Sequence, residues 1–201
     1  MMRLSKSFRL SATAAVVCFL PAAKAQADQL RVVASFSILK DMVEQVAGDA
    51  ATVTSLVGPD GDMHFFIPSP ADARELKGAD LLVVNGLEFE GWIDRLIDAS
   101  GFEGTMVVAS DGIDGLVNEE EDHEDHDDHA EHEHGEFDPH AWQSLSRAAV
   151  YVDNITAALS EAHPEAIASF SANAAAYRAQ IMALDAALKA DFATIDEHCT
   201  T

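Results

Sequence analysis

The stretch LRVVASFSILKDMVEQVAGDAATVTSLV, residues 30–57, decides the fold class of this chain. Its first part, Leu30 to Phe36, is rich in β-formers and predicts a short strand. From Ser37 to Ala47 the apolar residues recur at helical spacing, and Gly48 follows as a helix stop. Thr52 to Val57 then predicts a second strand. A strand, a helix and a strand in this order predict a crossover that pairs the two strands in parallel.

The same alternation continues along the chain. Pro70 to Lys77 predicts a short helix, because Ser69 is a good N-cap and proline suits the first helical position. Further strands are expected at 81–84 and 105–109, and further helices at 89–99 and 144–159. We therefore expect an α/β fold with a mainly parallel four-stranded sheet flanked by helices.

A long Ala-rich helix is predicted behind this domain. His163-Pro164 marks a break, since the residue before a proline avoids the helical conformation. From Pro164 to about Ile195 the apolar residues keep a helical spacing. We assign 28–163 to the α/β domain and 164–198 to the long helical segment.

Composition limits the classes of partner. Asp and Glu number 35 against 12 Lys and Arg, which gives a formal net charge of −23 over 201 residues. A chain this acidic offers no basic face for phosphates, so we expect no nucleic-acid partner. The natural partner of such a chain is a cation.

The N-terminus, residues 1–27, has the pattern of an export signal. Arg3, Lys6 and Arg9 form a positive region, and the apolar run from Leu10 to Leu20 is too short to span a bilayer. Small residues favour cleavage after Ala25 or Ala27, and an uncleaved anchor is the alternative. We expect the protein in the periplasm of a Gram-negative bacterium, without membrane insertion after cleavage.

Residues 115–137 differ sharply in composition, because they are dominated by Asp, Glu and His. Such a segment cannot bury a core, and we expect a disordered surface loop. Imidazole is the commonest zinc ligand, so the loop is a candidate auxiliary metal site, although copper or nickel would also be attracted. A solvated acidic linker with incidental histidines is the alternative. The five loop histidines are His123, His126, His129, His132 and His134.

Two further histidines lie where ligands of parallel sheets bind. His64 follows the turn after the second predicted strand, and His140 lies in Asp138-Pro139-His140-Ala141-Trp142, directly before a helix. Both are expected beyond the carboxyl ends of the strands, so they could converge on one cation. Each taken alone could equally be a surface histidine.

Four stretches together resemble a known family, the zinc- and manganese-type substrate-binding proteins of bacterial ABC importers, and most closely its zinc-uptake (ZnuA) type. The similarity covers residues 30–198. The stretches are VASFSILKDM (33–42), GPDGDMHFFIPSPAD (58–72), ADLLVVNG through EGW (79–92) and DPHAW (138–142).

The resemblance implies two α/β lobes joined by one long helix, with the metal held between them. It implies that His64 and His140 are metal ligands, that Zn2+ is the cargo, and that an ABC-transporter membrane permease is the partner. A full-length member is expected to be monomeric. The His-rich loop is similar to that of zinc members, which favours zinc over manganese.

Two departures from the family pattern stand out. Met63 occupies the position before the first histidine where proline or an acidic residue is usual, and this is expected to loosen the loop. The family's second lobe is absent from the sequence, so we expect a truncated receptor with half of its metal ligands. Cys199, a lone cysteine once the signal is removed, fits that expectation.

Several functions compete at this point. We expect a binding protein and no enzyme: a periplasmic receptor that captures Zn2+ for an ABC importer. A manganese receptor of the same family and a His-rich zinc buffer are alternatives. A zinc hydrolase is a further alternative, with His64 and His140 holding the metal and Asp138 as base. No recognisable third ligand or base supports the hydrolase.

Overall fold

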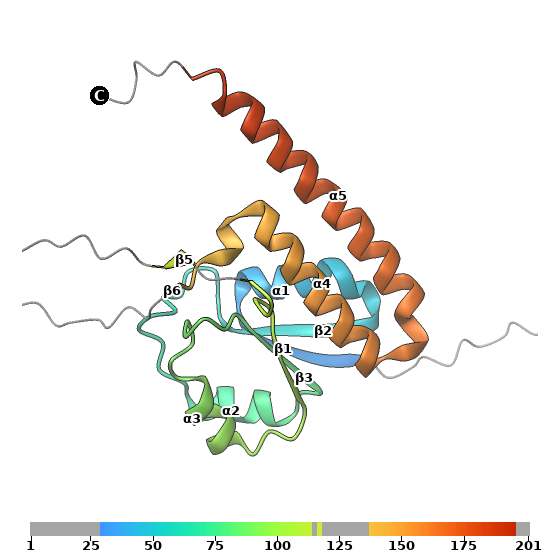
Figure 1. Ribbon diagram of the computed structural model, residues 1–201. Coiled ribbons are helices and arrows are strands. Elements are labelled where there is room, and N and C mark those ends of the chain that lie inside the picture. Colours follow the sequence, from blue (N-terminus) through green and yellow to red (C-terminus); the bar gives the residue numbers. More distant parts are fainter. Residues whose placement is uncertain (1–28, 114–115, 118–136, 196–201) are drawn as a thin grey trace, which may run out of the picture.

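The computed structural model describes residues 29–113, 116–117 and 137–195. The predicted export signal, the five loop histidines and Cys199 lie outside these residues. Within them, one sheet with helices on both faces forms the domain, and one long helix follows it (Figure 1).

A four-stranded sheet forms the centre of the domain. Its strands are β1 (Leu30–Phe36), β2 (Ala51–Val57), β3 (Leu81–Val84) and β4 (Thr105–Val108), in the spatial order β2-β1-β3-β4. All three pairings are parallel. This confirms the predicted α/β fold and its parallel four-stranded sheet. The carboxyl ends of the strands share one edge, so the loops after β2 and β3 begin at the same edge, with the end of β1 between them.

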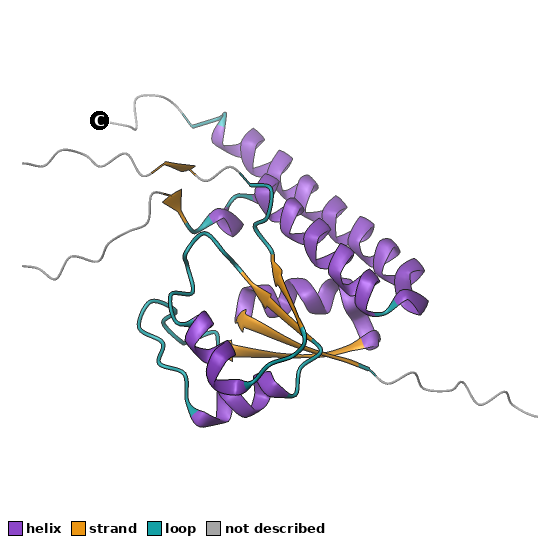
Figure 2. Cartoon of the chain, turned by 60° about the horizontal axis from the view of Figure 1, so that its bottom comes forward, coloured by secondary structure: helices purple, strands orange, loops and turns teal. Residues whose placement is uncertain are grey.

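Helices cover both faces of the sheet (Figure 2). The short helices α2 and α3 pack against each other, while α1, α4 and α5 pack together as a second layer. The helices are α1 (Ser37–Ala47), α2 (Pro70–Lys77), α3 (Ile93–Ser100), α4 (Leu145–Ala162) and α5 (Ile167–Phe192). None of the helices in the described part of the chain is long and apolar enough to cross a membrane.

Burial follows from this layering. The central strands β1 and β3 are covered on both faces, and all their residues except Arg31 are buried. This explains why their sequences are nearly continuous apolar runs rather than alternating ones. On α1, the residues at helical spacing form the buried face, namely Leu39, Met42, Val43, Val46 and Ala47.

Local signals place the start of α2. The Ser69 side chain accepts hydrogen bonds from the backbone N–H groups of Ala71 and Asp72, and the Asp72 carboxylate accepts one from the backbone N–H of Ser69. This reciprocal capping box fixes where the loop of His64 ends. The predicted N-cap at Ser69 is confirmed.

The predicted helix at 89–99 starts too early. The structure begins α3 at Ile93. Leu87 and Glu88 have positive φ angles of 53° and 60°, which are incompatible with a helix. The chain therefore makes a turn after β3 before the helix can start.

The long helix α5 follows a short 3₁₀ turn, η3 (Pro164–Ala166), instead of starting at Pro164 itself. Its buried residues are Phe170, Ala174 and Ile181, and they end well before the helix does. The predicted apolar positions Leu184 and Leu188 are exposed. Figure 1 shows the C-terminal half of α5 extending beyond the domain.

The two ends of the acidic segment are paired with each other. Leu116–Val117 forms β5 and Phe137–Asp138 forms β6, and the two strands are antiparallel. Residues 116, 117 and 137 belong to the segment 115–137 that the sequence predicted as a loop, so the two strands begin inside the predicted loop boundaries. The strand β6 leads directly to His140.

Candidate metal-binding site

The loop between β2 and α2 carries His64. Its imidazole is exposed, and its backbone N–H donates to Asp62 Oδ1 at 2.9 Å. The neighbouring Met63 side chain is buried in the core, with 7% of its surface exposed. The burial of Met63 anchors the loop one residue before His64.

His140 is oriented by the carboxylate of Asp138. The ring atom Nδ1 lies 2.8 Å from Asp138 Oδ1, and the backbone N–H of His140 donates to the same oxygen at 2.9 Å. These two hydrogen bonds hold the pKa of Asp138 below its usual value. An ionised carboxylate is a pure acceptor, so Nδ1 carries the proton. The lone pair of the neutral ring is then on Nε2, which is free to bind a cation.

The structure brings His64 and His140 together. Their ring centroids are 5.7 Å apart, although 76 positions separate them in the sequence. The Phe89 ring lies against both, with centroid distances of 5.4 Å to each. Trp142 packs against Phe89 and His140, and Phe36 packs against Trp142. The two imidazoles thus stand on an aromatic base at the carboxyl edge of the sheet.

A buried amide fixes the loop that presents His140. Asn85, at the end of β3, is fully buried. Its Nδ2 donates to the carbonyl oxygens of Pro139 (2.9 Å) and Gly86 (2.8 Å), and its Oδ1 accepts from the hydroxyl of Tyr151 on α4 at 2.6 Å. Both ends of the amide are satisfied, so this side chain ties the His140 loop to β3 and α4.

Glu90 closes the turn that carries Phe89. Its Oε1 accepts from Ser35 Oγ and from the backbone N–H of Asn85, both at 2.6 Å, and Oε2 accepts from the N–H of Gly86 at 3.2 Å. Burial raises the pKa of this carboxyl, and the hydrogen bonds only partly offset that effect. Glu90 therefore lies inside the domain, before α3 begins at Ile93.

Sequence reasoning found the two histidines but missed their supports. Asp138 was considered only as a catalytic base, whereas it orients His140. Asn85 and Tyr151 carried no local signal, since 66 positions separate them. The one available sign was the pair Asn85-Gly86 directly after an apolar strand, which marks a turn at the ligand edge.

The described residues contain no group of three or more His, Cys, Asp or Glu side chains that could hold a metal ion. His64 and His140 therefore form a two-histidine site here. The five loop histidines lie outside the described part of the chain.

A family model matches this arrangement along most of the chain. The model describes the periplasmic component A of zinc-uptake complexes, ZnuA, and it matches residues 32–201. The chain belongs to the ZnuA family. The match includes both histidine loops and the long helix α5.

Individual relatives of this ZnuA-family chain are named for different metals. The iron-binding protein YfeA of Yersinia pestis is 34% identical over 163 residues, which are 81% of this chain and 49% of YfeA. The solved Mn-bound periplasmic metal-binding protein of Candidatus Liberibacter asiaticus is 30% identical, with a TM-score of 0.72 over 84% of this chain and 59% of that one. The solved Zn(II)-bound AdcA of Streptococcus pneumoniae is 30% identical, with a TM-score of 0.66 over 79% and 32%.

The chain spans about half the length of the curated relatives that it matches. The similarity to the solved structures agrees with the α/β fold described above. The relatives are named as metal-binding or substrate-binding proteins, which agrees with the prediction of a binding protein that is not an enzyme.

Proposed function

We propose that this chain is the metal-binding lobe, with its connecting helix, of a periplasmic receptor that captures Zn2+ for an ABC-type importer. The observation that carries the proposal is the approach of two imidazoles, His64 and His140, at the carboxyl edge of a parallel sheet. Ligands of such sheets bind at this edge.

The spacing of the two rings suits a shared metal. Zinc–nitrogen bonds of about 2.0–2.1 Å and a tetrahedral angle put the centroids of two ligating imidazoles about 5 Å apart. The 5.7 Å measured here needs only a small adjustment of the exposed His64 ring. The hydrogen bond that Nδ1 of His140 donates to Asp138 leaves Nε2 of His140 as the ligand atom and raises its basicity.

Two histidines supply half of a four-coordinate zinc shell. We propose that the remaining ligands come from the second lobe of the complete receptor or from water. The domain boundaries that we infer are 28–163 for the metal-binding lobe and 164–198 for the connecting helix. The chain alone is then a weak binder compared with a complete receptor.

Zinc is the preferred cargo in this proposal. Both candidate ligands are imidazoles, and five further histidines lie in the acidic segment at 123–134. Manganese favours oxygen ligands, which the described pair does not supply. A manganese or iron receptor is the second candidate, because relatives are named for those metals. The loop histidines would act as an auxiliary site that collects metal before transfer.

Export and delivery complete the proposal. The N-terminal segment 1–27 has the pattern of a cleavable signal, which suits a protein of the Gram-negative periplasm. A membrane permease would receive the metal. The negative charge of the chain attracts cations and raises their rate of encounter.

Isothermal titration with Zn2+ and Mn2+ tests the proposal. The protein would be the chain without residues 119–136, so that loop binding does not mask the site. We expect one zinc site that the double variant His64→Ala/His140→Ala loses and that His163→Gln retains, with weaker binding of Mn2+. Unchanged zinc affinity in the double variant would refute the site. If removing residues 119–136 abolished all zinc binding, the chain would be a zinc buffer that works through its loop and not a receptor.

A further inference from the structure

The outer edge of β4 is the feature of the fold that metal binding does not use. This strand ends the order β2-β1-β3-β4, and no other strand among the described residues pairs with its free side. Thr105 and Met106 are exposed, and Val107 and Val108 are half-buried. An edge of this kind is a template for another strand.

Backbone groups of β4 point outward from the sheet. The N–H groups of Thr105 and Ala109 donate to Asp80 and Val84 on the side of β3, at 3.0 and 2.8 Å. Because successive residues of a strand alternate, the N–H groups of Met106 and Val108 face the free edge. The carbonyl of Met106 faces the same way, whereas that of Val108 accepts from the N–H of Asp111.

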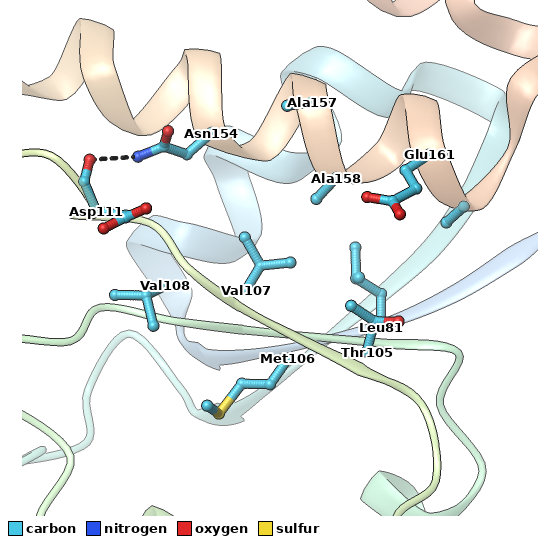
Figure 3. A pocket seen from close by; sticks show the side chains of 11 residues that line it. Leu81, Thr105, Met106, Val107, Val108, Asp111, Asn154, Ala157, Ala158 and Glu161 are labelled. Atoms are coloured by element: carbon cyan, nitrogen blue, oxygen red, sulfur yellow. Dashed lines mark hydrogen bonds between the residues drawn. The ribbon is translucent and has the colours of Figure 1, made fainter.

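A groove of about 660 Å³ runs between this edge and α4 (Figure 3). Its apolar lining comes from both sides, including Leu81 and Val107 from the sheet and Ala158 from the helix. Asn154 Nδ2 donates to the carbonyl oxygens of Ala109 (2.8 Å) and Asp111 (2.9 Å), which holds α4 at a fixed position along β4. The groove is therefore preformed, which lowers the cost of binding.

The charge of the groove favours positively charged ligands. Figure 3 shows Asp111 at one end and Glu161 at the opposite end, near Thr105. None of the eleven residues that line the groove is Lys, Arg or His. Both carboxylates are on exposed residues, so they can meet a partner without a large desolvation cost.

We propose that this groove docks an extended peptide segment of a partner protein, added as a fifth strand, with small or apolar residues in the middle and a Lys or Arg at each end. Main-chain hydrogen bonds to Met106 and Val108 supply binding, and the two carboxylates select basic flanks. The four residues of β4 span about 13 Å, which matches a segment of four to six residues.

A second copy of this chain is a poorer occupant. Pairing two β4 edges about a two-fold axis puts Asp111 of one copy beside Glu161 of the other, and like charges at such an edge repel. The same repulsion disfavours acidic peptides. Docking at this edge does not depend on metal binding, because neither histidine lines the groove.

Titration of the ¹⁵N-labelled chain with the peptide acetyl-Lys-Thr-Val-Thr-Val-Lys-amide tests the proposal. We expect the amide signals of Met106 and Val108 to shift most, and the affinity to fall with added salt. The matched peptide with Glu at both ends should bind at least about fivefold more weakly, as should a peptide with alternate backbone nitrogens methylated.

Protein variants complete the test. Asp111→Asn/Glu161→Gln should lower the affinity for the basic peptide about fivefold, while Asp98→Asn/Glu103→Gln, which removes two exposed acids outside the groove, should not. Circular dichroism checks that both variants fold. Equal binding of the acidic peptide, shifts confined to α5, or self-association through β4 in sedimentation would each overturn the proposal.

Discussion

At the scale of single residues, each of the two histidines donates a hydrogen bond to an aspartate two positions before it. Asp62 accepts from the backbone N–H of His64, and Asp138 accepts from both the ring and the backbone of His140. Only the second contact sets the tautomer of an imidazole. The site is therefore asymmetric: His140 is held in a binding-ready orientation, and His64 is an exposed ring on an anchored loop.

Replacing Asp138 tests this asymmetry. Asp138→Ala should weaken zinc binding roughly tenfold, because carboxylate partners of metal-bound histidines typically contribute 10- to 100-fold in affinity. Asp138→Asn should lose less, since its amide oxygen can still accept from Nδ1. Titration calorimetry on both variants measures the effect. Equal losses in the two variants, or no loss in Asp138→Ala, would contradict the assigned role.

Glu90 predicts a pH dependence of stability. Burial raises its pKa above the usual 4.5, so its contribution to stability is complete below pH 4.5 and is lost as pH rises through the raised pKa. The free energy of unfolding of the metal-free chain should therefore fall relative to Glu90→Gln over that range. The slope should not exceed about 1.4 kcal/mol per pH unit.

Urea denaturation at several pH values measures this difference, with the exposed Glu103→Gln as the control. Parallel curves for the wild type and Glu90→Gln would show that the carboxyl titrates normally.

Glu90 also shows a limit of what the sequence alone can predict. An acid three positions before the first residue of a helix could equally act at the helix N-terminus, and only the tertiary structure shows that Glu90 is buried.

At the scale of elements, local patterns predicted most of the fold. The strands and α1, α2 and α4 agree with their predicted ranges within three residues at each end, because apolar spacing and caps are local signals. The predicted start of α3 was too early because the chain first makes a turn, in which Leu87 and Glu88 have positive φ angles and the buried Glu90 accepts hydrogen bonds from Ser35 and Asn85. The approach of His64 to His140 could be predicted from the topology of the sheet. The hydrogen bond by which Asn85 holds the His140 loop could not be predicted from it.

The bond between Tyr151 and Asn85 joins α4 to the His140 loop. Tyr151→Phe leaves Asn85 Oδ1 buried without its donor, which should cost about 1–3 kcal/mol of unfolding free energy. Zinc affinity should also fall, because the Pro139 carbonyl is held less firmly. Tyr177→Phe is the control, because the Tyr177 hydroxyl on α5 interacts with Asp41 of α1 and not with Asn85. If the folded Tyr151→Phe variant bound zinc as tightly as the wild type, the hydrogen bond between Tyr151 and Asn85 would stabilise the fold without affecting the metal site.

At the scale of the whole molecule, α5 divides into a packed half and an exposed half. Its buried residues end at Ile181, and beyond it lie exposed apolar side chains. These are Met182, Leu184, Leu188, Phe192 and Ile195. The sequence spacing predicted a continuous apolar stripe, but it could not show how much of that stripe the domain covers.

Hydrogen exchange should reveal this division. Backbone amides after Ile181 should exchange at least about tenfold faster than those between Phe170 and Ile181, because only the first half packs on α1 and α4. Mass spectrometry of overlapping fragments measures both halves in one sample. Uniform protection along α5 would show that its second half is covered in solution, for example by self-association.

The most direct test of the central claim observes the two imidazoles themselves while zinc is added. The chain without residues 119–136, with ¹⁵N-labelled histidine rings, would be titrated with Zn2+ and followed by NMR. We predict that Nε2 of His140 and one ring nitrogen of His64 shift together and saturate with one zinc per chain, while His163 does not change. Zinc bound without a shift at both His64 and His140 would contradict the proposed site.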